Sequence, residues 1–283
     1  MCTDCGCSTP PEVPPLPFQP PRRVPLGANL LARNQQLADS NRAAFKALNL
    51  RAINLLAGPG AGKTTLLEVT LRHLRKKAPN RSLEVIEGDQ QTSLDAERIH
   101  RTGVPAVQIN TGLGCHLDAA MILRALTELH PEQDPGRSHP PQGSDTLLFI
   151  ENVGNLVCPA LWDLGENAKV VIFSVTEGEE KPLKYPDMFA AADLILLSKV
   201  DLLPYLSFDP NRALAACRAI NPEARVLPIS ATQGDGLDPW LDWLLELETT
   251  SAPRAWSAHN QKARPSWTSV TPLTPGLSQM SAS

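Results

Sequence analysis

The chain has 283 residues, 42% of them hydrophobic and 5% aromatic, so it is long enough for one large domain or two small ones with a mainly aliphatic core. Its 26 basic and 30 acidic side chains give a formal net charge of −4, which offers no electrostatic basis for binding nucleic acid or an anionic membrane. No apolar run approaches the roughly 20 residues of a membrane-spanning helix, and the N-terminus lacks the charged-then-apolar order of a signal peptide, so we expect a cytoplasmic protein with reduced thiols.

The first 25 residues combine a cysteine cluster with a proline-rich stretch. Cys2, Cys5 and Cys7 are half of the six cysteines in the chain, and residues 8–25 are dense in proline. Clustered thiols in a reducing compartment are more often metal ligands or redox groups than disulfides. The proline-rich stretch predicts an extended linker, so we assign residues 1–25 to an N-terminal metal-binding motif and its linker.

Residues 26–250 are expected to form one α/β domain, because helical segments alternate with short apolar strands. We predict helices over 28–48, 64–77, 117–129, 209–220 and 237–247, and strands over 52–57, 83–87, 106–110, 146–152, 169–176, 194–199 and 225–230. The strands are apolar on both faces, which predicts a doubly wound, mostly parallel sheet with helices on both sides. The first helix is expected to bury a stripe made of Leu30, Leu31, Ala38, Ala43, Phe45 and Leu48. Residues 131–145 are expected to be a surface loop, and residues 251–283 a disordered tail.

The stretch "LLAGPGAGKTTLLE" follows the first strand of this domain and opens a helix, which is the context of a P-loop. Backbone N–H groups of the loop can point at a phosphate, and the Lys63 ammonium can reach the β- and γ-phosphates. The Thr64 hydroxyl can ligate Mg²⁺, which bridges these phosphates. The strict pattern has glycine where this chain has Ala57, and the alternative is a glycine-rich turn without a ligand. The expected nucleotide contacts are Gly58, Pro59, Gly60, Ala61, Gly62, Lys63, Thr64 and Thr65.

A guanine site is predicted by "LILLSKVDL", which places Lys199 and Asp201 after a late strand, at the edge where open α/β sheets bind ligands. An aspartate there can accept hydrogen bonds from N1–H and the 2-amino group of guanine, a pair of donors that adenine lacks. The usual motif begins with Asn where this chain has Ser198, a shorter hydrogen-bonding group. Ser230 and Ala231 fit the following loop, whose backbone N–H contacts the guanine oxygen. We therefore expect GTP rather than ATP.

Two carboxylates are candidates for the switch regions that respond to the γ-phosphate. Asp89, in "IEGDQQT", follows the second strand and can hold Mg²⁺ through water or orient the attacking water. "FIENVGN" has the layout of the third GTPase motif, with Glu151 in place of the usual aspartate and Gly154 able to donate its N–H to the γ-phosphate. The alternative is that both carboxylates are solvated residues at strand ends. The expected catalytic residues are Lys63, Thr64, Asp89 and Glu151.

A second set of metal ligands is predicted next to these switches. Cys115 and His116 follow a strand, and Cys158 comes four residues after Gly154. Cysteine and histidine suit Zn²⁺ or Ni²⁺ better than Mg²⁺. Taken singly, each could be a buried thiol or a hydrogen-bonded histidine. Three ligands leave the coordination incomplete, so a second subunit could supply the rest, and movement of the switch would move Cys158. Cys217 is expected only to pack.

The N-terminal "MCTDCGC" places three thiols so close to the chain start that the α-amine can join them. Gly6 allows the backbone to turn tightly enough for two sulfurs to face one ion. Three thiolates and an amine in a plane would select Ni²⁺, whereas Zn²⁺ prefers a tetrahedron. The alternatives are a structural zinc knot and a redox-active cysteine pair.

Taken in order, these motifs resemble those of the HypB family, GTPases that help to deliver nickel during maturation of [NiFe]-hydrogenases. The resemblance runs from about Leu26 to Leu247 and includes the N-terminal CxxCGC. The matching stretches are GPGAGKTT, EGDQQT, GCH, ENVGNLVCP, TEGEEKPLKYP and KVDLLPY. The chain lacks the histidine-rich N-terminal stretch of many relatives, which argues against nickel storage, and its adjacent Cys115 and His116 differ from the Cys-Pro-His of urease's nickel GTPase.

The resemblance implies a P-loop NTPase fold and a slow GTPase that gates nickel transfer. It implies a tight nickel site at Cys2, Cys5 and Cys7, and a weaker nickel or zinc site at Cys115, His116 and Cys158 on a GTP-dependent homodimer interface. It also implies two protein partners, a nickel-delivery protein and the hydrogenase large subunit. The sequence leaves open two other functions, a metal buffer with a structural P-loop and a P-loop kinase or ATPase.

Overall fold

The computed structural model describes residues 26–89, 94–112, 114–131 and 145–247. The N-terminal cysteines, the proline-rich linker, most of the expected surface loop and the C-terminal tail lie outside these residues. In the described part, no helix combines the length and the hydropathy that crossing a membrane would require.

Strands and helices alternate along the chain, as the sequence predicts. The strands are β1 (Leu50–Ala57), β2 (Ser82–Asp89), β3 (Ala106–Asn110), β4 (Thr146–Glu151), β5 (Ala168–Ser174), β6 (Leu194–Ser198) and β7 (Arg225–Ile229). The α-helices are α1 (Leu26–Ala47), α2 (Lys63–Lys77), α3 (Leu94–His100), α4 (Ala119–Leu129), α5 (Lys181–Lys184), α6 (Pro186–Ala190), α7 (Pro210–Ile220) and α8 (Leu237–Glu246). Short 3₁₀ turns are η1 (Cys158–Leu161), η2 (Val175–Glu177) and η3 (Val200–Tyr205).

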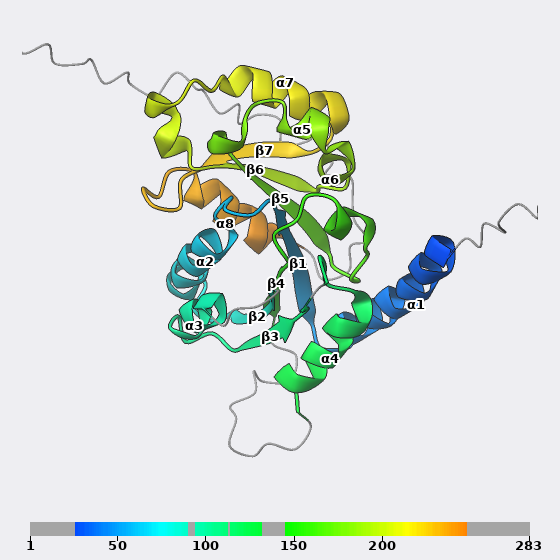
Figure 1. Cartoon of the computed structure of the whole chain (residues 1–283). Coiled ribbons are helices and arrows are strands. Elements are labelled where there is room, and N and C mark those ends of the chain that lie inside the picture. Colours follow the sequence, from blue (N-terminus) through cyan, green and yellow to red (C-terminus); the bar gives the residue numbers. More distant parts are fainter. Residues whose placement is uncertain (1–25, 90–93, 113, 132–144, 248–283) are drawn as a thin grey trace, which may run out of the picture.

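All seven strands pair in parallel in the order β3-β2-β4-β1-β5-β6-β7, so β1 lies in the middle of the sheet (Figure 1). Helices α2, α3 and α8 pack on one face, where they form the largest core cluster with β1 and its neighbours. Helices α1 and α4 cover one part of the other face, and α6 and α7 cover the rest. Alternate residues of β1 belong to opposite cores, which confirms the doubly wound α/β fold.

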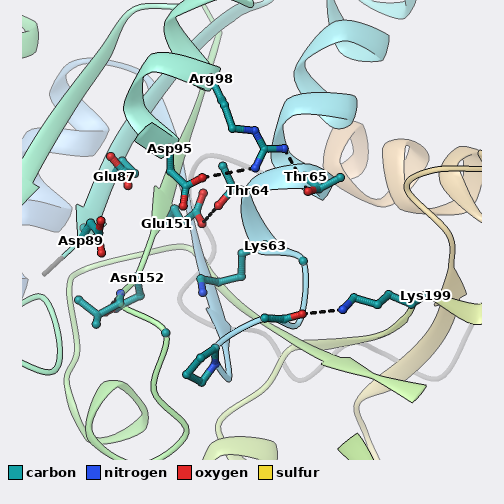
Figure 2. Close-up of a pocket in the computed structure, with 16 residues that line it drawn as sticks. Lys63, Thr64, Thr65, Glu87, Asp89, Asp95, Arg98, Glu151, Asn152 and Lys199 are labelled. Carbon is teal, nitrogen blue, oxygen red and sulfur yellow. Dashed lines mark hydrogen bonds and ion pairs between the residues drawn. The ribbon is translucent and has the colours of Figure 1, made fainter. Parts of the chain in front are cut away.

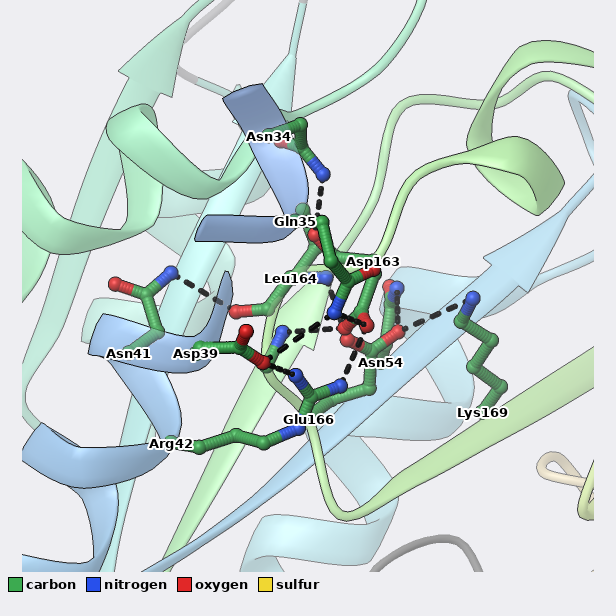
Figure 3. A network of polar contacts seen from close by, with 11 residues as sticks. Asn34, Gln35, Asp39, Asn41, Arg42, Asn54, Asp163, Leu164, Glu166 and Lys169 are labelled. Carbon is green, nitrogen blue, oxygen red and sulfur yellow. Dashed lines mark hydrogen bonds and ion pairs between the residues drawn. The ribbon is translucent and has the colours of Figure 1, made fainter. Parts of the chain in front are cut away.

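Helix α1 buries a different face from the one that apolar periodicity predicts. Its buried residues are Asn34, Ala38, Asn41 and Phe45, whereas the predicted stripe members Leu30, Leu31, Ala43 and Leu48 are exposed. The amide nitrogens of the two asparagines find backbone acceptors: Asn34 Nδ2 donates to the Asp163 carbonyl at 2.7 Å, and Asn41 Nδ2 donates to the Leu164 and Ala119 carbonyls at 2.9 Å each (Figure 3). Of the predicted stripe only Ala38 and Phe45 are buried, so hydropathy identified the buried face in part.

Other differences from the predicted elements arise from local capping. The predicted helix 117–129 starts at Ala119, because the Asp118 carboxylate accepts the Met121 N–H at 2.8 Å and caps it. The predicted strand 169–176 ends at Ser174, which forms a capping box with Glu177 and starts a 3₁₀ turn. Helix α3 and the short helices α5 and α6 were not predicted; each has seven residues or fewer and so little periodicity to detect.

Candidate nucleotide and metal sites

The P-loop joins β1 to α2 and owes its shape to glycines. Gly60 and Gly62 have φ of 74° and 95°, in the left-handed region that favours glycine. At Gly58 an added Cβ would lie 2.8 Å from Glu177 Oε1, so a larger residue there would displace the Glu177 side chain. Ala57 is buried at the end of β1 with φ outside the left-handed region. Alanine therefore fits where the strict pattern has glycine.

A cavity of about 540 Å³ opens in front of the P-loop, at the carboxyl ends of β1, β2 and β4 (Figure 2). The cavity gathers the residues predicted for phosphate and for the switches, although these come from three separate parts of the chain. Its lining residues are Pro59, Gly60, Gly62, Lys63, Thr64, Thr65, Glu87, Gly88, Asp89, Asp95, Arg98, Glu151, Asn152, Val153, Gly154 and Lys199. Of the predicted P-loop residues, Gly58 and Ala61 do not line this cavity.

Glu151 is linked directly to the start of helix α2. The Thr64 hydroxyl donates to Glu151 Oε1 at 2.7 Å, and Glu151 is 4% exposed. Burial raises the pKa of the Glu151 carboxyl, while the nearby Lys63 ammonium lowers it. The alternative of a solvated strand-end carboxylate is therefore wrong for Glu151. Asp89 is half-buried and faces the cavity from the end of β2.

Three further charged residues of the cavity were missed as site residues in the sequence. Glu87 is 2% exposed, and burial together with the charges of Glu151 and Asp89 raises its pKa to about 8. Arg98 donates to Thr65 Oγ1 at 3.1 Å and forms an ion pair with Asp95 at 3.3 Å (Figure 2). Glu87 could have been found in the sequence, because it is a charged residue near the end of an apolar strand. Asp95 and Arg98 lie on the unpredicted helix α3, so no sequence pattern aimed them at the site.

A second cavity, of about 300 Å³, adjoins the first and shares Gly62, Thr65 and Lys199 with it. It gathers three of the four residues predicted to bind the base, Lys199, Asp201 and Ala231, together with apolar neighbours, whereas the predicted Ser230 is fully buried and does not line it. The lining is Ala61, Gly62, Thr65, Leu66, Ser198, Lys199, Asp201, Leu202, Ile229, Ala231 and Thr232.

The residues of the KxD stretch are held by the two loops beside them. Asp201 Oδ1 accepts the Ser230 hydroxyl at 2.6 Å, so Ser230 positions the carboxylate. Lys199 adopts φ 59°, and its Nζ donates to the Gly60 carbonyl at 2.7 Å (Figure 2). The Ser198 hydroxyl is buried and donates to the Ala61 carbonyl at 2.8 Å. Ser198 thus ties β6 to the P-loop, and its hydroxyl is used there.

Cys115, His116 and Cys158 come together at the same edge of the sheet. One ligand atom from each lies within 4.8 Å of the others, and all three residues are half-buried. His116 stacks on Trp162 with ring centroids 4.3 Å apart, and burial lowers its pKa, which favours the neutral ring that can ligate a metal. A hydrogen bond with Cys115 raises the pKa of Cys158. Sulfur and imidazole donors at these distances fit a borderline metal such as Ni²⁺ or Zn²⁺.

Cys217 behaves as the sequence predicts. It lies on α7 with its side chain fully buried in the core, and desolvation raises its pKa to about 12. A thiol in that state packs as a small apolar group.

Comparison with known proteins agrees with this geometry. Residues 52–228 match the family model described as CobW/HypB/UreG, nucleotide-binding domain. The hydrogenase maturation factor HypB of Cupriavidus necator is 52% identical, with 79% of this chain and 69% of that protein covered. HypB of Escherichia coli K12 is 55% identical, with 79% and 72% covered.

Two solved structures have the same fold. HypB from Helicobacter pylori in complex with nickel is 36% identical, with a TM-score of 0.69 and with 78% of this chain and all of that chain covered. HypB from Archaeoglobus fulgidus is 38% identical, with a TM-score of 0.67 and with 76% and 98% covered. The chain therefore belongs to the CobW/HypB/UreG family of P-loop nucleotide-binding proteins and, within it, is a hydrogenase maturation factor of the HypB type.

Proposed function

We propose that this protein is a GTP-hydrolysing metallochaperone that binds nickel and gates its delivery to the hydrogenase large subunit. The observation that carries the proposal is the closeness of two sites of different chemistry. The P-loop cavity is lined by Gly154, and Cys158 of the sulfur–imidazole cluster follows four residues later. A change of nucleotide would therefore act on the metal ligands through a short piece of chain.

In this mechanism the P-loop backbone and Lys63 hold the β- and γ-phosphates. Thr64 and Asp89 would hold Mg²⁺, which would supply charge stabilisation for the phosphates. Glu151 fixes the Thr64 hydroxyl by the 2.7 Å hydrogen bond. Gly154 senses the γ-phosphate, since an added Cβ there would lie 3.3 Å from Pro59 Cα and 3.5 Å from Lys63 Nζ.

The second cavity holds the guanine base. Asp201 accepts from the guanine donors, and Ser230 keeps its carboxylate in place. Ala231 lines the same cavity and offers its backbone, and the Lys199 stem lies across the purine. These contacts favour GTP over ATP, because adenine lacks the pair of donors that the half-buried Asp201 carboxylate would accept.

The metal ligands fall into two sets. Cys115, His116 and Cys158 hold Ni²⁺ or Zn²⁺, and a GTP-dependent homodimer completes the coordination. Cys2, Cys5 and Cys7 with the α-amine hold one Ni²⁺. A nickel-delivery protein and the hydrogenase large subunit are the proposed partners, in keeping with relatives named as hydrogenase maturation factors.

Three measurements test this function. GTP turnover with and without Ni²⁺ separates a GTPase from a metal buffer, which would show none. A direct competition between GTP and ATP separates a GTPase from an ATPase or kinase. Metal stoichiometry with and without a GTP analogue, in the full chain and in a chain lacking residues 1–7, assigns the metals to the two sets of ligands.

A further inference from the structure

The segment between Glu151 and Asp163 connects the two proposed sites, and its two ends are anchored to different parts of the fold. At the first end, the Asn152 N–H donates to the Leu55 carbonyl of β1 at 3.1 Å. At the other end, the Asp163 carbonyl accepts Asn34 of α1 at 2.7 Å (Figure 3). In between, Leu156, Pro159 and Ala160 are buried, whereas Val157, just before Cys158, and Leu161 are each 56% exposed.

Asn152 has a buried side chain that reaches sideways to the loop of Cys115 and His116. It is 1% exposed, and its Oδ1 accepts the N–H of Leu117 at 3.1 Å and that of Val153 at 3.0 Å. Its Nδ2 donates to Asn54 Oδ1 at 3.2 Å, and Asn54 in turn donates to Glu166 at 3.0 Å (Figure 3). Since neighbouring strand residues point to opposite faces, Glu151 faces the P-loop helix while Asn152 faces the metal loop.

The metal loop is held rigidly where Asn152 meets it. Leu117 is fully buried, and its side chain packs so closely on β2 that an added Cβ at Gly88 would lie 2.8 Å from it. Two residues later, the Ala119 N–H donates to Asn34 Oδ1 at 2.9 Å, and the Ala119 carbonyl accepts Asn41 at 2.9 Å. The pair Cys115 and His116 is therefore attached to the sheet and to α1.

Cys158 is attached instead to the chain that follows Gly154. Asn155 Oδ1 accepts the N–H groups of Val157 at 2.8 Å and Cys158 at 3.4 Å, so the turn that carries Cys158 is built on Asn155. Gly154 itself has only backbone against the P-loop, where an added Cβ would lie 3.3 Å from Pro59 Cα.

We propose that the metal cluster has a fixed half, Cys115 and His116, and a movable half, Cys158, and that Asn152 is the positioning residue that anchors the fixed half. The inference rests on the proposed function, because the movement comes from the nucleotide. A displacement of Gly154 then changes the distance of Cys158 from the fixed pair instead of carrying all three ligands together. Without the Asn152 bond, the metal loop loses the anchor nearest to Cys115 and His116, and a change of nucleotide state is converted less fully into a change of metal geometry.

The first test uses the wild-type full chain without metal. Amide hydrogen exchange is measured in the apo state, with GDP and with a non-hydrolysable GTP analogue, after calorimetry has established nucleotide binding. We expect the Leu117 amide to stay protected in all three states and the Val157 and Cys158 amides to change with nucleotide. If neither nucleotide binds, both the proposed function and this inference fail. If both nucleotides bind, the inference alone fails in either of two cases. In the first, protection changes at Leu117 as much as at Cys158; in the second, it changes at neither amide.

The second test compares Asn152→Ala with Asn221→Ala in full-length chains that also carry Cys2→Ser, Cys5→Ser and Cys7→Ser. Asn221 is the matched control, since its amide donates to the carbonyls of Phe189, Ala190 and Ala192, away from both sites. For Asn152→Ala we expect Ni²⁺ to bind about tenfold more weakly and the Leu117 amide to lose its protection. We also expect the Ni²⁺ affinity measured with the GTP analogue to be about the same as that measured with GDP.

Rescue by a conservative variant separates positioning from general destabilisation. Asn152→Asp keeps the oxygen that accepts the Leu117 and Val153 N–H groups and loses only the donation to Asn54, so it should restore Leu117 protection. The inference is overturned if Asn152→Ala has wild-type Ni²⁺ affinity and Leu117 protection, or if Asn221→Ala loses both equally. If the chain that keeps Asn152 binds Ni²⁺ with the same affinity in every nucleotide state, the gating function is refuted. The effect of Asn152→Ala on protection of the Leu117 amide can still be measured in that case.

Discussion

Glu87 and Glu151 are register partners on the adjacent parallel strands β2 and β4, and both are buried beside the P-loop. One oxygen of each, Oε2, lacks a hydrogen-bond partner among the described residues. Two buried carboxyls this close cannot both ionise without cost, so their protonation is coupled to whatever binds in the cavity.

The folded protein should lose stability as pH rises through the titration of Glu87. Its pKa is raised from 4.5 to about 8, so the folded state holds a proton that the unfolded chain has released. This contribution is fully present below about pH 4.5 and is lost by about pH 8. Glu87→Gln does not titrate, so the difference between its free energy of unfolding and that of the wild type should shift in favour of the variant as pH rises from 5 to 8. The shift should be on the order of 4 kcal/mol. Urea unfolding of both proteins without Mg²⁺ or nucleotide measures it, and parallel pH profiles would contradict it.

Lys63→Ala should reduce GTP turnover by at least about 100-fold, because it removes the cation that offsets charge on the β- and γ-phosphates. Phosphate release under single-turnover conditions is the measurement. Lys76→Ala is the matched control, since Lys76 is exposed near the other end of α2 and should leave turnover unchanged. Equal turnover in Lys63→Ala and wild type would remove Lys63 from the catalytic set.

Asp201→Asn should weaken GTP by at least about tenfold and relax the preference over ATP, because one guanine donor then faces an amide donor. Ser230→Ala should cause a smaller loss, since it removes only the 2.6 Å hydrogen bond that orients Asp201. Competition binding with GTP and ATP measures both variants. Full guanine selectivity in Asp201→Asn would show that the base binds elsewhere.

Substituting Cys115, His116 or Cys158 by alanine should abolish metal binding at the half-buried cluster and leave GDP binding intact. Cys217→Ala is the control for loss of a thiol, because Cys217 lies on α7 with its side chain buried in the core.

In the wild type, a GTP analogue should promote a dimer and change metal affinity at the cluster. Metal should in turn change nucleotide affinity or dimerisation by the matching free energy. Calorimetry and light scattering measure these effects. The switch would be refuted by identical metal affinity and mass in the apo, GDP and GTP-analogue states.

Cys2→Ala, Cys5→Ala and Cys7→Ala should each abolish the nickel site of residues 1–7 and its thiolate-to-nickel charge-transfer absorption, while GTP turnover stays intact. An N-terminal tag should weaken nickel binding, because the α-amine is then lost as a ligand. The same affinity and spectrum in a tagged chain would rule out the amine. Loss of GTP turnover in the cysteine variants would show that the motif belongs to the folded domain.

The residue order alone predicts the succession of the seven strands and the five longer helices, the P-loop and the family. These depend on local causes that the residue order carries directly: apolar strands, glycines that must take positive φ, and the strand-to-helix context of GKTT. The three-residue metal cluster was also predictable, because Cys115, His116 and Cys158 follow strands whose carboxyl ends share one edge of a parallel sheet.

Tertiary structure alone decided which polar residues are buried and what they hold. Asn34 and Asn41 lie on the buried face of α1, where their amide nitrogens donate to backbone carbonyls from distant parts of the chain, so hydropathy could not place these two residues on that face. Ser198 looks like a shortened base contact in sequence, but its hydroxyl is bound to the P-loop carbonyl of Ala61. The pairing of Glu87 with Glu151 and the reach of Asn152 to Leu117 depend on which strands become neighbours in the sheet, and no local pattern in the residue order encodes that choice.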